Sequence, residues 1–285
     1  MVKDQEHWNV VIDPRRPWWV VDLRELWRYR DLLKLLVRRD LLAVYKQTIL
    51  GPAWQVVQPL LTSIMFAVVF GMMARLAEPG YPPLLFYMSG VVPWLFFASV
   101  LNRTAQTLVF NAQLMTKVYY PRLISPMATT LSASVSFFTQ LATFSLFAVY
   151  FHLMGEFTMR FRPDAALLPL LIIVLMMIAG GLGLLVSALT TKFRDFTVLL
   201  GFGVQLLMFM SPVIFPLSRV PEGSTLRTVI ELNPMTPVIE GFRAVLLGTP
   251  MDWGTMLYAV GFAVGSTVVG ILIFQRAERS FADVV

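Results

Sequence analysis

The sequence has 285 residues, of which 57% are apolar and 14% are charged, and its formal net charge is +6. Ordinary soluble domains carry about 25% charged residues, so this composition indicates a polytopic membrane protein and not a soluble enzyme. The sequence contains no cysteine, which excludes disulfide bridges, thiolate metal sites and thiol nucleophiles. In a membrane protein an excess of Lys and Arg in the cytoplasmic loops accounts for the positive net charge, so no nucleic acid partner is predicted.

The N-terminal segment predicts a helix that lies on the membrane. The first twenty residues lack the apolar core of a signal peptide, which predicts that the N-terminus stays in the cytoplasm. Residues 21–46 are basic and imperfectly amphipathic, as is typical of an interfacial helix. Its apolar stripe is formed by Leu23, Leu26, Trp27, Leu33, Val37, Leu41, Val44 and Tyr45. Two interpretations stay open: a plain membrane anchor, or a docking element for a cytoplasmic partner that pushes on the first span at Gly51-Pro52.

Six uncharged stretches then have the length and apolar character of transmembrane helices. They are Ala53–Met73, Leu84–Asn102, Pro126–Met154, Ala165–Thr191, Phe196–Leu217 and Gly254–Phe274. We therefore expect an all-α fold in which residues 53–274 form one six-span membrane domain. Residues 1–52 and 275–285 form the flanking cytoplasmic segments.

The distribution of basic residues sets the expected orientation. Segments 1–52, 103–125, 190–196 and 275–285 contain 17 of the 23 Lys and Arg residues. Cytoplasmic loops carry such an excess, so both termini are predicted to lie in the cytoplasm.

The segment before the last span, residues 218–253, is semi-apolar and rich in Pro and Gly. Two short helices fit it, near Ser224–Leu232 and Thr236–Leu247. At 1.5 Å per residue neither crosses a hydrocarbon core of about 30 Å. They predict either a re-entrant hairpin, whose backbone must be covered by protein or water, or an interfacial loop.

Several kinds of chemistry are missing from the sequence. No lysine follows a glycine, so there is no P-loop for ATP, and His7 and His152 are too far apart to suggest a metal site. The spans carry no ionisable residue away from their ends, which weakens an ion-coupled mechanism. We therefore expect a transport subunit with no catalytic residues, no metal and no cofactor of its own, driven by energy from another chain.

For two further features of the sequence, a purely structural interpretation and a functional one both stay open. The loop 103–125 carries Lys117, Tyr119 and Tyr120 and fits either a solvated loop or a second docking element. Aromatic residues gather near the span ends, where belts of Trp and Tyr are usual. Some of them are alternatively candidates to line a pore for sugars, namely Trp54, Tyr87 and Trp94.

Five motifs resemble the permeases of type 2 ABC exporters for cell-surface polysaccharides. The motifs are Arg38-Arg39-Asp40 with Tyr45-Lys46 and Leu50-Gly51-Pro52-x-Trp54; Asn111-x-x-Leu114-x-x-Lys117-Val118-Tyr119-Tyr120-Pro121-Arg122; Lys192-Phe193-Arg194-Asp195; Ser211-Pro212-Val213-Ile214-Phe215; and Leu232-Asn233-Pro234-Met235-Thr236-Pro237 with Phe242-Arg243. The resemblance runs from about residue 30 to the C-terminus.

The resemblance implies a bacterial inner-membrane permease that exports a lipid-linked glycan such as O-antigen. It implies a homodimer with separate ATPase subunits, which bind ATP and Mg²⁺. The residues implied in ATPase contact are Arg38, Asp40, Tyr45, Lys46, Lys117, Tyr119, Tyr120 and Arg122. Those implied at an outer gate are Asn233, Pro234, Pro237, Phe242 and Arg243. The alternatives are export of drugs or simple lipids, an ATP-independent secondary transporter, and a non-transporting scaffold.

Overall fold

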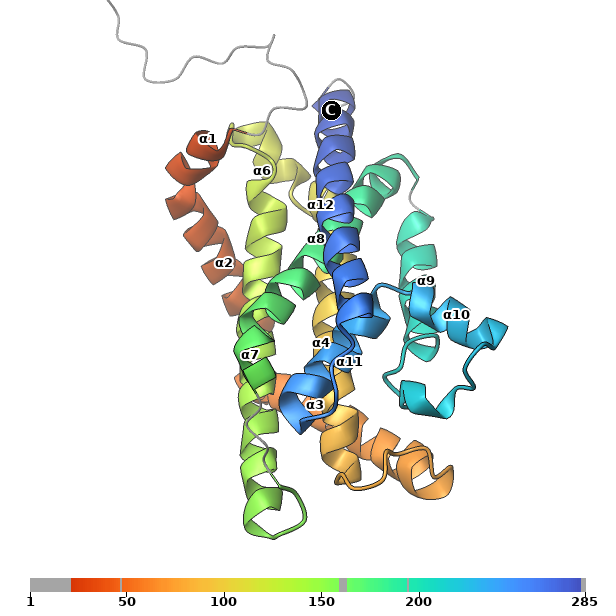
Figure 1. Cartoon of the computed structure of the whole chain (residues 1–285). Coiled ribbons are helices and arrows are strands. Elements are labelled where there is room, and N and C mark those ends of the chain that lie inside the picture. Colours follow the sequence, from red (N-terminus) through yellow and green to blue (C-terminus); the bar gives the residue numbers. More distant parts are fainter. Residues whose placement is uncertain (1–21, 47, 159–162, 194, 283–285) are drawn as a thin grey trace, which may run out of the picture.

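A computed structural model describes residues 22–46, 48–158, 163–193 and 195–282, and this part of the chain is helical without any strand (Figure 1). The predicted all-α fold is confirmed. The α-helices are α1 (Leu23–Arg28), α2 (Arg30–Tyr45), α3 (Trp54–Phe66), α4 (Pro83–Ala105), α5 (Thr107–Phe110), α6 (Ala112–Lys117), α7 (Ile124–Leu153), α8 (Leu168–Lys192), α9 (Phe196–Phe209), α10 (Thr225–Leu232), α11 (Met235–Leu247) and α12 (Trp253–Ala282). Shorter elements are η1 (Gly51–Ala53), the π-helical η2 (Ala67–Met73), η3 (Pro163–Leu167) and η4 (Leu217–Arg219).

The core of the bundle forms around α4, most of whose residues are buried. α4 packs against α3, α7, α8 and α11, so protein covers most of its surface. α12 packs closely along α8 because glycines meet there: the backbone of Gly270 lies against the carbonyl of Gly181. α1, α6 and the C-terminal end of α12 lie at the same end of the bundle, while α7 extends far toward the opposite end (Figure 1).

Five helical stretches of the described chain are long and apolar enough to cross a membrane. They are Gly51–Met73, Pro83–Ala105, Ile124–Leu153, Ala165–Lys192 and Trp253–Ala277, close to five of the six predicted spans. The chain is therefore a multi-pass membrane protein.

The fifth predicted span is shorter than expected. α9 ends at Phe209, and at 1.5 Å per residue its 14 residues extend about 21 Å. The predicted end at Leu217 is wrong because Pro212 disfavours a helical conformation at Ser211, and the chain turns there. The count of six spans is not confirmed and stays a prediction.

The N-terminal helix is divided at Tyr29 into α1 and α2. The predicted apolar stripe only partly describes its contacts. Leu36, which is not part of that stripe, is buried against α7, whereas Leu23 and Trp27 of the stripe are exposed. Leu23 and Trp27 belong to α1, which is separated from α2 at Tyr29, whereas it is α2 that packs along α7.

The segment before the last span forms the two short helices predicted for it, α10 and α11. α11 is largely buried against α4, α8 and α12. Protein therefore covers its backbone, which is the condition that a re-entrant hairpin requires. The re-entrant placement itself stays a prediction.

Candidate functional site

The two predicted docking elements, α2 and the segment 111–122, lie against each other at the α1 end of the bundle. Asp40 of α2 accepts from Arg39 at 2.9 Å and from Arg103, at the end of α4, at 3.3 Å. Arg39 also donates to the side-chain oxygen of Asn111 at 3.2 Å. The side chain of Asp40 is 13% exposed, and those of Arg39 and Arg103 are 50% and 37% exposed, so this partly exposed cluster ties α2 to α4 and to the start of α6.

An apolar cluster joins the same elements to α7. Tyr120 packs with Leu36 of α2 and with Ile124 and Ala128 of α7, and all four are buried. The Tyr120 hydroxyl lies 3.0 Å from the Ser125 hydroxyl, and burial raises the pKa of Tyr120 above its ordinary value. A displacement of α2 or of the loop before α7 would therefore be transmitted directly to α7.

The predicted ATPase-contact residues fall into two groups. Arg38, Lys46, Lys117 and Tyr119 are exposed, and Arg122 is half-buried. Asp40 and Tyr120 instead make internal contacts. The side chain of Tyr45 lies outside the described part of the structure. The exposed members remain candidates for a partner surface, and the internal members hold that surface onto the membrane helices.

The predicted outer-gate residues lie in a joint between α11, α4 and the turn after α9. Arg243 is 1% exposed and its guanidinium lies 4.1 Å from the ring centroid of Phe86. It donates to Glu240 at 2.8 Å and to the Val213 carbonyl at 3.2 Å. A buried charge needs such partners, since an unpaired one is costly.

The same joint includes Asn233, which comes just before α11. Its side-chain amide donates to the Ser211 hydroxyl at 2.7 Å, and its side-chain oxygen accepts from the Met235 amide at 3.0 Å. Phe242 is buried with its ring 5.9 Å from Phe137 of α7. Pro237 is buried and Pro234 half-buried. The structure thus brings together two of the sequence motifs, and their role in a gate stays a prediction.

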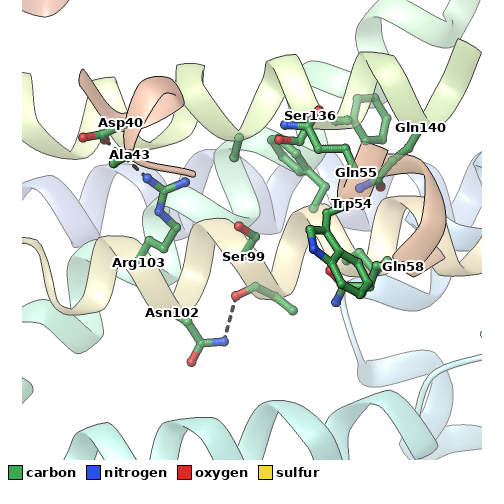
Figure 2. Close-up of a pocket in the computed structure, with 15 residues that line it drawn as sticks. Asp40, Ala43, Trp54, Gln55, Gln58, Ser99, Asn102, Arg103, Ser136 and Gln140 are labelled. Atoms are coloured by element: carbon green, nitrogen blue, oxygen red, sulfur yellow. Dashed lines mark hydrogen bonds and ion pairs between the residues drawn. The ribbon is translucent and has the colours of Figure 1, made fainter. Parts of the chain in front are cut away.

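The three aromatic residues predicted to line a pore have different environments. Tyr87 and Trp94 are 0% and 2% exposed and pack inside the core, so neither faces open space in this structure. Trp54 is 47% exposed and lines a groove between α2, α3, α4 and α7 with a volume of about 660 Å³ (Figure 2).

Several polar side chains line that groove, and the sequence interpretation missed them. Its side chains include Gln55 and Gln58 of α3, Ser99, Asn102 and Arg103 of α4, and Ser136 and Gln140 of α7. Figure 2 shows Asp40 and Arg103 at one end and Trp54, Gln55, Gln58 and Gln140 at the other. The available signal was the spacing of three or four residues between these polar positions, which places them on one face of each helix.

Within the described residues no group of three or more His, Asp or Glu side chains is placed to hold a metal ion. The arrangement offers hydrogen bonds, aromatic surfaces and mechanical coupling between helices. It therefore suits binding and movement. That ATP and Mg²⁺ bind to a separate partner stays a prediction.

Comparisons with known proteins agree on one family. Residues 31–247 match the family described as ABC-2 type transporter. An O-antigen export system permease protein RfbA from Klebsiella pneumoniae is 26% identical over 246 residues, covering 85% of this chain and 90% of the relative. RfbA from Myxococcus xanthus is 25% identical with the same coverage. The polysialic acid transport protein KpsM from Escherichia coli is 24% identical, covering 81% of this chain and 87% of the relative.

Proposed function

Because the chain belongs to the ABC-2 type transporter family, we propose that it is the membrane permease of an ATP-driven exporter of a lipid-linked polysaccharide. Two copies form the channel in a bacterial inner membrane, with both termini in the cytoplasm. Separate ATPase subunits bind ATP and Mg²⁺. The polymer resembles O-antigen in being carried on a lipid and moved outward.

The observation that carries this proposal is the similarity, over more than four-fifths of the chain, to relatives named for O-antigen export and polysialic acid transport. The geometry at the α1 end supports it independently. Arg38, Lys46 and Lys117 are exposed basic residues on the elements proposed to dock the ATPase. The Asp40–Arg103 pair and the Tyr120 cluster link these elements to α4 and α7.

The proposed mechanism follows from that coupling. Closure of the ATPase subunits on ATP pushes α2 and the segment 111–122. The ion pair to Arg103 and the contact of Leu36 with Tyr120 pass the movement to α4 and α7. The channel between the two copies then opens for the polymer, and α10 and α11 control its outer mouth.

The test is co-purification of the tagged chain with the ATPase encoded beside it, followed by a polymer export assay in a deletion strain. We expect a complex of two copies of each subunit and polymer at the cell surface only when both are present. A monomer without bound ATPase, or export that continues after ATP hydrolysis is abolished, would overturn the proposal. Unchanged surface polymer in the deletion strain would exclude the polysaccharide as cargo.

A further inference from the structure

The groove between α2, α3, α4 and α7 has a mainly apolar lining that includes polar side chains within the membrane part of the bundle. Each of α3, α4 and α7 contributes neutral hydrogen-bonding side chains, and all three belong to candidate membrane spans. These side chains are Gln55, Gln58, Ser99, Asn102, Ser136 and Gln140. Lipid tails offer no hydrogen bonds, so such groups need protein, water or ligand as partners.

The protein supplies partners for some of these side chains, Gln55 among them. Asn102 donates to the Ala98 carbonyl of its own helix at 2.7 Å. Within the described residues, the side chains of Gln58, Ser99 and Ser136 make no hydrogen bond. The side-chain oxygen of Gln140 is buried and has no partner among them. The open hydrogen-bonding groups of Gln58, Ser99 and Ser136 can therefore pair with a polar occupant of the groove.

The charges of the lining favour a neutral occupant. Asp40 and Arg103 are the ionisable residues that line the groove, and they pair with each other at 3.3 Å. A phosphate or diphosphate would compete with Asp40 for the Arg103 guanidinium. A hydroxyl group both donates and accepts, as do the paired N–H₂ and C=O groups of each glutamine amide.

The apolar part of the lining includes three aromatic residues beside Ala43, Leu95, Ala98 and Ala133. Trp54, Phe96 and Phe137 line the groove, and the Trp54 ring is the most exposed of the three. Aromatic faces bury apolar surface, including the C–H face of a sugar ring. The volume of about 660 Å³ falls within the range of about 300–1,000 Å³ usual for small-ligand sites.

We propose that this groove is a sugar-binding subsite, which holds neutral sugar residues of the exported glycan through the glutamine amides and the Trp54 ring. The proposal rests on the proposed function, because that function supplies the glycan. The proposal adds a place where the glycan contacts the protein, next to α2, the helix proposed to transmit the movement of the ATPase. Export would then begin with sugar residues held beside the Asp40–Arg103 pair.

The experiment uses single-cysteine variants, which are clean because the sequence contains no cysteine. Ser99→Cys and Ser136→Cys place a thiol in the groove, and Ser145→Cys places one on an exposed face of the same α7. The full-length chain is held in phospholipid nanodiscs and treated with a water-soluble maleimide. The probes are a neutral mannose tetrasaccharide and, at equal concentration, inorganic pyrophosphate.

We expect both groove cysteines to react faster than Ser145→Cys, and the tetrasaccharide to slow their labelling about tenfold at a concentration well above its Kd. Pyrophosphate should not slow them. Adding Gln140→Leu should remove most of the protection, while its melting temperature shows that the chain is folded. The reaction of Ser145→Cys should be unchanged by either probe.

Three results would overturn the subsite. Groove cysteines that react no faster than Ser145→Cys would mean that lipid fills the groove. Protection by pyrophosphate but not by sugar would mean an anion site. Labelling that neither probe slows would mean water alone. Because this assay needs neither ATP nor a partner, its failure is distinct from a failure of ATPase co-purification.

Discussion

The guanidinium of Arg103, at the end of α4, donates to the carboxylate of Asp40 in α2 at 3.3 Å. This contact joins the N-terminal helix to the most buried of the candidate membrane spans. Asp40 keeps a second donor, Arg39, at 2.9 Å. Asp40 is therefore the shared partner of both arginines. If either arginine is lost, the other still pairs with Asp40, whereas loss of the Asp40 carboxylate leaves two neighbouring cations without an acidic partner in this cluster.

This relationship predicts that Asp40→Asn is more harmful than Arg103→Gln. Arg103 is 37% exposed, so its loss should cost less than about 1 kcal/mol of stability, as for other solvent-accessible pairs. Asp40→Asn removes both pairs and should lower export further. Melting temperature and polymer export of the two variants check this order. A larger defect for Arg103→Gln would contradict it, and Lys34→Gln, which removes an exposed pair on the same helix, serves as control.

The contact between α8 and α12 predicts a sharp difference between two glycines of the same helix. A Cβ at Gly270 would collide with the Gly181 carbonyl, whereas one at Gly265 would meet nothing within 4 Å. Gly270→Ala should therefore destabilise the bundle by about 1–3 kcal/mol through overpacking. Gly265→Ala should be neutral, or stabilising by up to about 1 kcal/mol through helix propensity. Thermal unfolding of both variants measures the difference, and equal melting temperatures would show that the helices do not meet at Gly270.

Two Arg–Glu pairs in the hairpin before α12 allow a matched comparison of burial. Arg243 is 1% exposed and pairs with Glu240, whereas Arg227 is partly exposed and pairs with Glu231 at 2.7 Å. Arg243→Met should cost about 3–5 kcal/mol, because Glu240 and the backbone carbonyls lose their donor. Arg227→Met should cost about 1 kcal/mol or less.

The measurement is again the melting temperature, with the yield of folded chain as a second readout. Adding Glu240→Gln to Arg243→Met should restore part of the stability, since it removes the carboxylate left without its partner. If Arg243→Met and Arg227→Met behave alike, the buried joint does not stabilise the hairpin.

Much of this fold could be predicted because lipid restricts which residues a span can carry. The uncharged stretch Ala165–Thr191 corresponds closely to the helical span Ala165–Lys192, and the proline and glycine positions marked the short helices α10 and α11. The sequence alone did not predict which apolar residues of the N-terminal helices are buried. It could not tell that Leu36 packs on α7 while Trp27 stays exposed, because both are apolar and only the neighbouring helix decides between them.

The candidate sites were less predictable for the same reason. The resemblance implied Arg243 at an outer gate, and only the fold shows that its guanidinium is buried and donates to the Val213 carbonyl. The groove was invisible because Gln55 and Gln140 lie far apart in the sequence and meet only when α3 and α7 assemble. Motif resemblance identified the exposed residues Arg38 and Lys117 without showing what joins them to the membrane helices.

The buried hydroxyl of Tyr120 predicts a specific loss of stability at alkaline pH. Burial raises the pKa of Tyr120, whereas an unfolded chain keeps the ordinary value of about 10. The neutral hydroxyl therefore contributes its full stabilisation below about pH 10, and this is lost as the pH rises toward the folded-state pKa, because the unfolded state loses its proton first.

Tyr120→Phe should cost about 1 kcal/mol at pH 8, since the contact of the hydroxyl with Ser125 is lost. The variant lacks the titrating group, so its melting temperature should fall less steeply above about pH 10. The difference in melting temperature between wild type and variant should therefore become smaller above about pH 10. All other groups that titrate at alkaline pH are present in both proteins, so their effects cancel in this difference. Parallel pH profiles would show that the Tyr120 hydroxyl is solvated. That result would also weaken the proposed mechanical link from α2 to α7, because the link depends on Tyr120 being enclosed between Leu36 and Ile124.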